Sequence, residues 1–212
     1  MSESNSQDRI LYQLKRRGPM SAKALGAELG MTTMGARQHL AQLEADDLVA
    51  TQPEETQGRG RPVKRWKLTK GGHNRFPDSH AQVTSDLLIA VTELLGESAL
   101  DQLIQQRTEA TQKVYQGSLD RFDQINEKLE ALARLRTEEG YMAEVEQTPA
   151  GYKLIEHHCP ICLAATTCQG FCRSELEVFQ SLFEGLATVS REEHLISGAR
   201  RCSYAVIPTT EN

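Results

Sequence analysis

Short helical patterns of apolar residues, separated by polar turns, fill the start of the chain. Residues 8–17 predict a first helix, because apolar side chains recur there every three to four positions, and Gly18 followed by Pro19 ends it. A second helix is predicted from Ser21, whose hydroxyl can cap it, to Gly30, a residue type that tolerates the left-handed exit from a helix. The side chains that these helices are expected to bury are Ile10, Leu11, Leu14, Ala24, Leu25 and Leu29.

A third helix is predicted in the segment "TTMGARQHLAQLEADDLV". Ala36, Leu40 and Leu43 fall at i, i+4 and i+7, so they form one stripe that can pack on the first two helices. The other face carries short, amide-bearing and basic side chains, which suit a DNA major groove because arginine pairs with guanine and glutamine with adenine. A three-helix bundle with a solvated polar face is the alternative. The candidate DNA-contacting residues of this helix are Thr33, Met34, Gly35, Arg37, Gln38 and Gln42.

A glycine-rich, basic hairpin is predicted next, in "TQGRGRPVKRWKLT", where two strand-like runs flank the tip. Such a hairpin beside three helices is a wing. Arg59 and Arg61 at its tip are expected to enter a DNA minor groove, where the negative potential favours guanidinium groups. Trp66 is expected to pack in the core under the wing rather than to stack on a base. The side chains expected to follow the phosphates are Lys64, Arg65 and Lys67.

The charge of the chain is divided along its length. The net charge is -5, yet residues 1–75 hold 13 lysines and arginines against 8 acidic residues, and the remainder holds 11 against 21. Because residues 1–75 are basic and the remainder is acidic, we expect a polyanionic partner for residues 1–75 alone. The order of elements and phrases such as "ALGAELGMTTMGARQHLAQLEADDLV" resemble the winged-helix domains of bacterial repressors of the ArsR/DeoR type, over about residues 7–75. The resemblance implies a transcriptional regulator whose partner is double-stranded DNA.

Amphipathic helical stretches occupy the middle of the chain from Pro77 to Gly140, with a break at Gly96. Their apolar stripes are expected to form the interface of a homodimer, because a two-fold dimer matches a palindromic DNA site. Packing within a single chain is the alternative. The apolar positions of these stripes are Val83, Leu87, Leu88, Val91, Leu94, Leu95, Leu119, Phe122, Ile125, Leu129 and Leu132.

The last third of the chain combines strand and helix patterns. "GYMAEVEQTPAGYKLIEHHCP" predicts two strands around a turn at "TPAG", and "TVSREEHLISGARRCSYAVIP" predicts a second hairpin that turns at Ser197-Gly198. Between them, a helix in "CRSELEVFQSLFEGL" places Cys172 on the same face as Phe179 and Phe183, so this cysteine is expected to point toward the core. The fold class predicted for the chain is α+β, with a winged helix-turn-helix in residues 1–76, a helical connector and dimerisation region in residues 77–140, and a small cysteine-rich sensor domain in residues 141–212.

Four of the five cysteines lie within residues 159–172, and the fifth is Cys202. The chain has neither a signal-peptide pattern nor a run of about 18 apolar residues, so a cytoplasmic protein without a membrane span is expected. In that reducing compartment a cysteine cluster indicates metal binding or redox chemistry rather than disulfides. The spacing C-x2-C-x5-C-x3-C matches neither a zinc finger nor the compact ferredoxin run, so spacing alone leaves the kind of metal or cluster open.

The frame "HCP", then "CRSELE", then "EEHLISGARRCSY" resembles the sensor domain of the SufR-like iron-sulfur regulators, which also carry a winged helix in front. The resemblance runs over nearly the whole chain. It implies a [4Fe-4S] cluster held by Cys159, Cys172, Cys202 and one further ligand. Some family members have another cysteine between the last two frame positions, whereas this chain has Cys162 and Cys168 in the first interval. These two cysteines are therefore candidate additional ligands.

Other uses of the thiols stay open on the sequence alone. Zinc could take the place of the cluster, or the thiols could respond to oxidants directly. A remote alternative is a thiol oxidoreductase that uses Cys159 and Cys162, but neither a paired acid and base nor a phosphate-binding glycine loop supports an enzyme, so none is expected. His157, His158 and His194 are further candidate ligands, although histidines beside a strand end are more often solvated or hydrogen-bonded.

Overall fold

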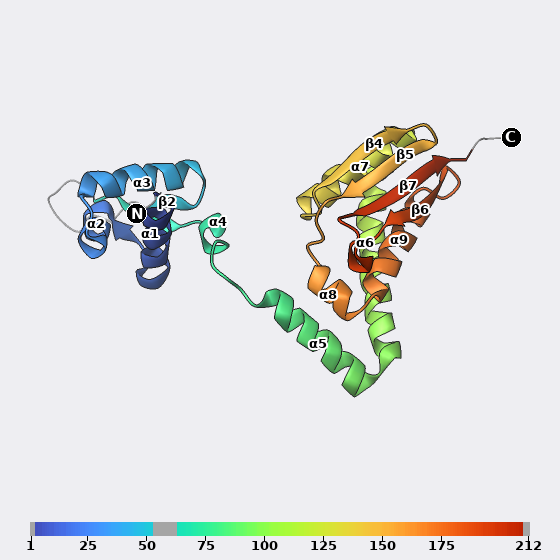
Figure 1. The fold of residues 1–212 in the computed structure, drawn as a ribbon, viewed down its shortest axis with the longest axis horizontal. Helices are drawn as coiled ribbons and strands as arrows, with labels where there is room; N and C mark the ends of the chain where they lie inside the picture. The colour runs from blue at the N-terminus through green and yellow to red at the C-terminus, as the bar shows by residue number, and fades with distance from the viewer. Residues whose placement is uncertain (1–2, 53–62, 210–212) are drawn as a thin grey trace. The chain divides into compact units, whose positions relative to one another are not determined.

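The computed structural model describes residues 3–52 and 63–209, and the chain divides into two compact units, Met1–Asp78 and Ser79–Asn212 (Figure 1). The strands of the first unit pair antiparallel in the order β1-β3-β2, and Met20 lies opposite Trp66. Three helices on a small sheet, with β2 and β3 as the arms of the wing, form the predicted winged helix-turn-helix. The elements of this unit are α1 (Glu3–Arg17), β1 (Met20–Ser21), α2 (Ala22–Leu29), α3 (Thr33–Ala45), β2 (Val49–Gln52), β3 (Arg65–Leu68) and α4 (Lys70–His73).

Side-chain caps fix the turn between α2 and α3. The backbone N–H of Ala24 donates to Ser21 Oγ at 3.2 Å, which confirms the predicted cap of α2. Gly30 ends that helix with a φ of 67°, in the left-handed region that glycine tolerates best. Two residues later the hydroxyl of Thr32 accepts from the N–H of Gly35 at 3.0 Å and starts α3. The chain is thereby held in the tight turn of a helix-turn-helix.

The core of the first unit contains all but one of the apolar residues predicted for it. Ala24 is exposed, and that prediction was wrong: α2 begins at Ala22, so Ala22, Leu25 and Leu29 make the inward stripe and Ala24 falls outside it. Trp66 is only 6% exposed, which confirms its place in the core. The buried residues of this core are Ile10, Leu11, Leu14, Ala22, Leu25, Leu29, Ala36, Leu40, Leu43, Val49, Trp66 and Leu68.

The second unit combines the predicted helical connector and the cysteine-rich region. Its antiparallel sheet has the strand order β4-β5-β7-β6, and Thr148 pairs with Gly151 across the predicted "TPAG" turn. The second predicted hairpin is present as β6 and β7, and a short 3-10 helix, η1, precedes Gly198. The elements are α5 (His80–Leu95), α6 (Glu97–Leu119), α7 (Ile125–Glu138), β4 (Ala143–Thr148), β5 (Gly151–Glu156), α8 (Cys162–Thr167), α9 (Gly170–Leu182), β6 (Ala187–Glu193), η1 (Leu195–Ser197) and β7 (Cys202–Pro208).

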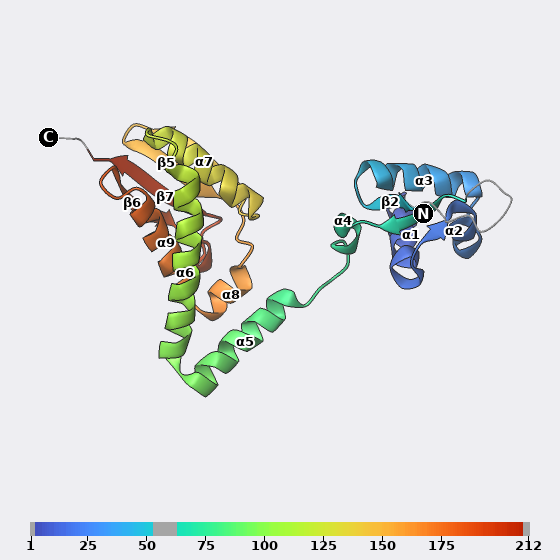
Figure 2. The same cartoon turned by 180° about the vertical axis from the view of Figure 1, so that it is seen from behind.

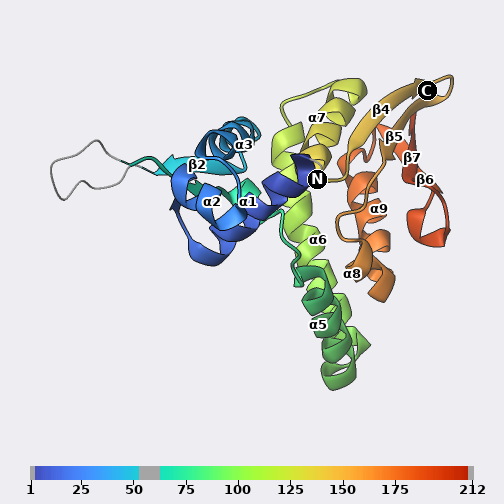
Figure 3. The ribbon, with the colours of Figure 1, turned by 60° about the vertical axis from the view of Figure 1, so that its left-hand side comes forward.

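One face of this sheet is covered by helices. α7 and α9 pack against the strands, and α6 packs against both of these helices (Figure 2). In Figure 3 the unit is turned so that α6 and α7 lie to one side of β4 and β5. Phe179 of α9 meets Tyr204 of β7 edge to face, with ring centroids 4.9 Å apart. The predicted stripe that includes Leu129 and Leu132 is buried in this core, so it packs within one chain.

The first connector helix, α5, differs from the others. Its described side chains bury little apolar surface, and its buried residue is Ser85, whose hydroxyl lies 2.7 Å from that of Thr167 in α8. Every helix of the described residues is too short or too polar to cross a lipid bilayer. The large apolar side chains exposed on α5 are Val83, Leu87, Ile89, Leu94 and Leu95.

Candidate DNA-binding face and cysteine site

The outward surface of α3 carries the predicted DNA-contacting residues in two neighbouring stripes. Met34, Gln38 and Gln42 form one stripe and are exposed, and Gln42 also donates to Asp46 at 3.1 Å. Thr33 and Arg37 belong to the other stripe, which borders a hollow between α3 and β3. Ala36, Leu40 and Leu43 are the buried residues of α3, so the residues of both stripes lie outside the core.

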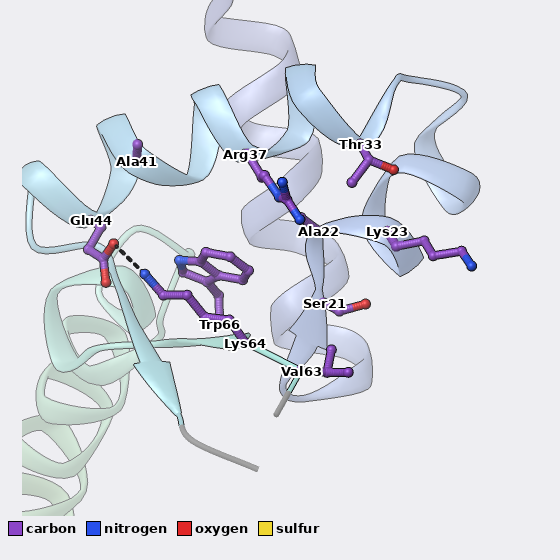
Figure 4. A pocket seen from close by; sticks show the side chains of 10 residues that line it. All are labelled: Ser21, Ala22, Lys23, Thr33, Arg37, Ala41, Glu44, Val63, Lys64 and Trp66. Atoms are coloured by element: carbon purple, nitrogen blue, oxygen red, sulfur yellow. Dashed lines mark ion pairs between the residues drawn. The ribbon is translucent and has the colours of Figure 1, made fainter. Parts of the chain in front are cut away.

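Figure 4 shows the hollow from close by; its volume is about 810 Å³. Thr33 and Arg37 of α3 line one side, and Lys64 and Trp66 line the other. The ammonium group of Lys64 lies 3.6 Å from the Glu44 carboxylate and 4.9 Å from the centre of the Trp66 ring. Arginine and lysine therefore face the same open space from two elements, which suits contact with a polyanion.

The wing carries the remaining DNA-binding candidates. Lys64 precedes β3, and Arg65 is its first residue. Arg59 and Arg61 lie outside the described residues, so their expected place in a minor groove stays a prediction. Trp66 Nε1 is buried without a hydrogen-bond partner in the described residues.

Three cysteines from separate segments meet at one end of the second unit's sheet. Cys202 is the first residue of β7 and pairs with Glu156, the last residue of β5. Cys159 follows three residues after Glu156, and the first turn of α9 supplies Cys172. All three thiols line a single cavity, together with Tyr141, Glu156, Glu175 and His194. The three cysteines that the resemblance implied are thus brought together by the antiparallel register and by the start of α9.

Burial disfavours the ionised form of these three thiols. It raises the pKa of Cys159 to about 12 and that of Cys172 to about 11, with the Glu175 carboxylate adding to the effect, and it raises the pKa of Cys202 as well. The cysteines are free rather than disulfide-bonded. Since a thiolate is the form that binds metal, a cation in this cavity would compensate the charge that burial disfavours.

A buried polar network supports the cavity from behind. Arg136, 3% exposed, donates from Nε to Glu156 Oε1 at 2.5 Å and from Nη2 to Glu175. The hydroxyl of Tyr204 donates to the second oxygen of Glu175 at 2.8 Å. Arg191 donates to the carbonyl of Cys172 at 2.5 Å. Two arginines therefore hold the carboxylates and the backbone next to the thiols.

The cavity lining does not include the four further candidate ligands, Cys162, Cys168, His157 and His158. Cys162 begins α8 and Cys168 follows its last residue, and both are partly buried. His157 lies 2.8 Å from the Glu144 carboxylate, and His158 is exposed. In the described residues no three cysteine, histidine or carboxylate side chains are grouped closely enough to chelate a single metal ion.

The donor set nevertheless fits a polynuclear cluster chemically. Free cysteine thiols are the donors that iron-sulfur clusters use. In a [4Fe-4S] cluster each cysteine ligates a different iron, so the thiols need not surround one point. His194 adds an imidazole whose pKa is lowered by burial and by Arg191. The sequence alone did not predict a role at this site for Glu156, Glu175 and Arg136.

The first unit has the fold and the basic exposed face of a winged-helix DNA-binding domain. Residues 4–60 match the sequence model of the MarR family, so this domain is that of a DNA-binding transcriptional regulator of the MarR/winged-helix type. The match confirms the predicted kind of domain, a winged helix that binds DNA, and it is a match to the MarR family. The second unit lies outside the matched residues.

Three crystal structures are similar to parts of the chain. They are the transcriptional regulator PA4135 (23% identity, 52% of this chain, 77% of that chain, TM-score 0.31), the adhesin competence repressor AdcR of Streptococcus pyogenes (17%, 63%, 76%, 0.28), and PadR of Bacillus subtilis in complex with operator DNA (17%, 64%, 90%, 0.29). No curated protein sequence matches the chain at a significant level.

Proposed function

We propose that this chain is a homodimeric transcriptional regulator whose affinity for a double-stranded DNA operator is controlled by a [4Fe-4S] cluster. Cys159, Cys172 and Cys202 hold the cluster, and one further ligand completes the set. The observation that carries the proposal is the convergence of three free cysteines, from three segments of the second unit, on one cavity. A protein that acts on DNA has its place in the cytoplasm.

Binding of a cluster would change the conformation of the second unit directly. The cavity has a volume of about 10 Å³, which is the room that one water molecule needs. A cluster of eight atoms is larger than one water molecule, so its binding would move the β5–α8 loop, the start of α9 and the start of β7 apart. In a dimer, such a change alters the spacing of the two recognition helices, which must match half-sites about one DNA turn apart.

The rival uses of the site make different demands. A thiol redox switch needs accessible cysteines of low pKa, whereas burial raises the pKa of Cys159 and Cys172. The raised pKa of Cys159 also argues against a thiol oxidoreductase that uses this cysteine. A mononuclear zinc site needs four donors around one ion, at about 2.0–2.3 Å. The observed donor arrangement favours a cluster over these alternatives.

The metal content of the protein tests the proposal. Protein purified without oxygen is expected to be brown, to absorb broadly near about 400 nm, and to contain roughly four iron and four sulfide per chain. A colourless protein with stoichiometric zinc would overturn the cluster and make the site structural or zinc-sensing. A protein free of both, with thiols that react reversibly with peroxide, would make it a thiol switch.

Arg37 is expected to read a base in the operator. Replacing it with alanine should weaken binding to the preferred duplex by about 1–3 kcal/mol and relax the preference at one base pair, because a bidentate contact to guanine is lost. Arg37 is exposed on α3 and borders the hollow opposite Lys64, so the change leaves the core intact. Anisotropy titrations against a duplex selected from a random-sequence pool, and its single-base variants, measure both effects.

Arg16, exposed in the last turn of α1, is the matched control. Arg16→Ala removes the same charge and should leave base preference unchanged. Equal losses for Arg16→Ala and Arg37→Ala would mean that Arg37 contributes only general charge attraction, and its role in base reading would have to be withdrawn.

The apolar face of α5 is expected to form the dimer interface. Leu94 is 81% exposed and Leu87 is 61% exposed. The helix buries little of its apolar surface against the described residues. Leu94→Glu should raise the dimer dissociation constant by at least about 100-fold, because a change on a two-fold interface occurs twice and each leucine is worth about 1.5–3 kcal/mol. Sedimentation equilibrium measures it. Tyr12→Glu, in the first unit, is the exposed control, and an unchanged dimer in Leu94→Glu would exclude this face.

A further inference from the structure

Among the described residues on the cavity lining, His194 has a buried ring nitrogen without a hydrogen-bond partner. In the described residues, five side-chain nitrogen or oxygen atoms are buried without a hydrogen-bond partner. One of them, His194 Nε2, belongs to a residue that lines the same cavity as Cys159, Cys172 and Cys202. An unpartnered buried nitrogen costs free energy in a folded protein unless it has another partner.

The local fold holds His194 beside Cys202. β6 ends at Glu193, and His194 is the cap residue of η1. The next backbone N–H, that of Leu195, donates to Cys202 Sγ at 3.5 Å, so this turn lies against the sulfur. His194 Nδ1 lies 3.0 Å from Ser197 Oγ. A proton on Nδ1 that is donated to Ser197 leaves the lone pair of Nε2 directed to another partner, which is the usual arrangement of a ligating histidine.

Carboxylate oxygens on the lining are engaged with Arg136 and Tyr204. Both carboxylate oxygens of Glu175 accept hydrogen bonds, one from Arg136 and one from Tyr204. Oε1 of Glu156 accepts from Arg136 Nε at 2.5 Å. These carboxylates serve the buried arginine, so using them as ligands would break an ion pair.

We propose that His194, through Nε2, is the fourth protein ligand of the site formed by Cys159, Cys172 and Cys202. The inference rests on the proposed function and names the ligand that the three cysteines leave open. It also assigns Cys162 and Cys168 to other roles, since neither lines the cavity. Replacement of thiolate by histidine raises the reduction potential of iron-sulfur clusters, so this ligand would make the cluster easier to reduce.

Hyperfine spectroscopy of the reduced protein tests the assignment. Wild-type chain and the variants His194→Ala, His158→Ala, Cys162→Ser and Cys168→Ser are purified without oxygen and analysed for iron and sulfide. Pulsed electron paramagnetic resonance of protein with ¹⁵N-labelled histidine then detects a nitrogen bound directly to iron. Wild type and the three other variants are expected to show this strong nitrogen coupling. His194→Ala is expected to lose it and to release iron to a chelator on the order of 10-fold faster.

The outcomes separate the two proposals. Wild-type protein that holds the cluster but shows no directly bound nitrogen would overturn the role of His194 and leave the three cysteine ligands in place. The same holds if His194→Ala keeps the coupling, or if Cys162→Ser or Cys168→Ser loses the cluster instead. Wild-type protein without iron and sulfide would overturn the proposed function, and this ligand assignment with it. Circular dichroism of the cluster-free proteins checks that His194→Ala folds as the wild type does.

Discussion

Protein in which Cys172 is replaced by serine is expected to lack a stable iron-sulfur cluster and to bind DNA as cluster-free wild type does. Cys172 lines the cavity from the first turn of α9, and the backbone carbonyl of the same residue is held by Arg191. A serine hydroxyl cannot replace the thiolate that an iron-sulfur cluster requires. Iron should fall from roughly four per chain to below about one, as measured by colorimetric assay on protein purified without oxygen.

Cys168→Ser is the matched control for this substitution. Cys168 lies four positions earlier in the chain and does not line the cavity, so its replacement should leave iron, sulfide and DNA affinity unchanged. A Cys172→Ser protein that still binds a full cluster and still responds to its removal would contradict the ligand assignment.

Arg136→Ala is expected to lower the free energy of unfolding of the second unit by about 3–5 kcal/mol. Arg136 is 3% exposed and its guanidinium holds both Glu156 and Glu175. Its removal leaves carboxylates in a buried place without their cation. Denaturant titration of the cluster-free protein followed by circular dichroism measures the loss. Trp66 is the chain's one tryptophan and lies in the first unit, so its fluorescence should report an unchanged transition there.

The loss in Arg136→Ala should depend on pH. Burial already raises the pKa of Glu156, and Arg136 lowers it, so the variant has a still higher folded-state pKa at this carboxyl. A group whose pKa is raised on folding contributes stability below its unfolded pKa and loses it as the pH rises through the folded value. The defect should therefore be larger at pH 8 than at pH 5. Arg134→Ala, exposed on the same helix, should stay within about 0.5 kcal/mol of wild type, and an equal loss there would contradict the network's role.

The winged helix could be predicted from the sequence because its signals are local. The cap at Ser21, the left-handed Gly30 and the stripe of Leu40 and Leu43 each act within one or two turns of helix. Ala24 was misplaced because helical spacing fixes an inward stripe only once the first helical residue is known. The split of the α3 surface into two stripes depends on where β3 packs, which no local pattern contains.

The cysteine site was predictable in part. Hairpin patterns placed β5 and β7, and their register brings Cys202 near Cys159, but the ligand set itself came from a family resemblance. The buried network was missed because charged residues were assigned to solvated faces. One signal was present: Arg136 falls at i+4 from Leu132 and i+7 from Leu129, on the apolar stripe of α7. A charged residue at such a position indicates a buried partner. Glu175 gives the same signal in α9, where it lies one turn after Cys172.

The central claim is that the cluster controls DNA affinity, and one measurement tests it most directly. The affinity of anaerobically purified protein for a duplex selected from a random-sequence pool is compared before and after the cluster is removed from the same preparation, with iron and sulfide determined in both. Our account predicts a change in the dissociation constant of roughly 5- to 150-fold, which corresponds to a coupling of about 1–3 kcal/mol. Equal affinities for loaded and cluster-free protein would contradict it.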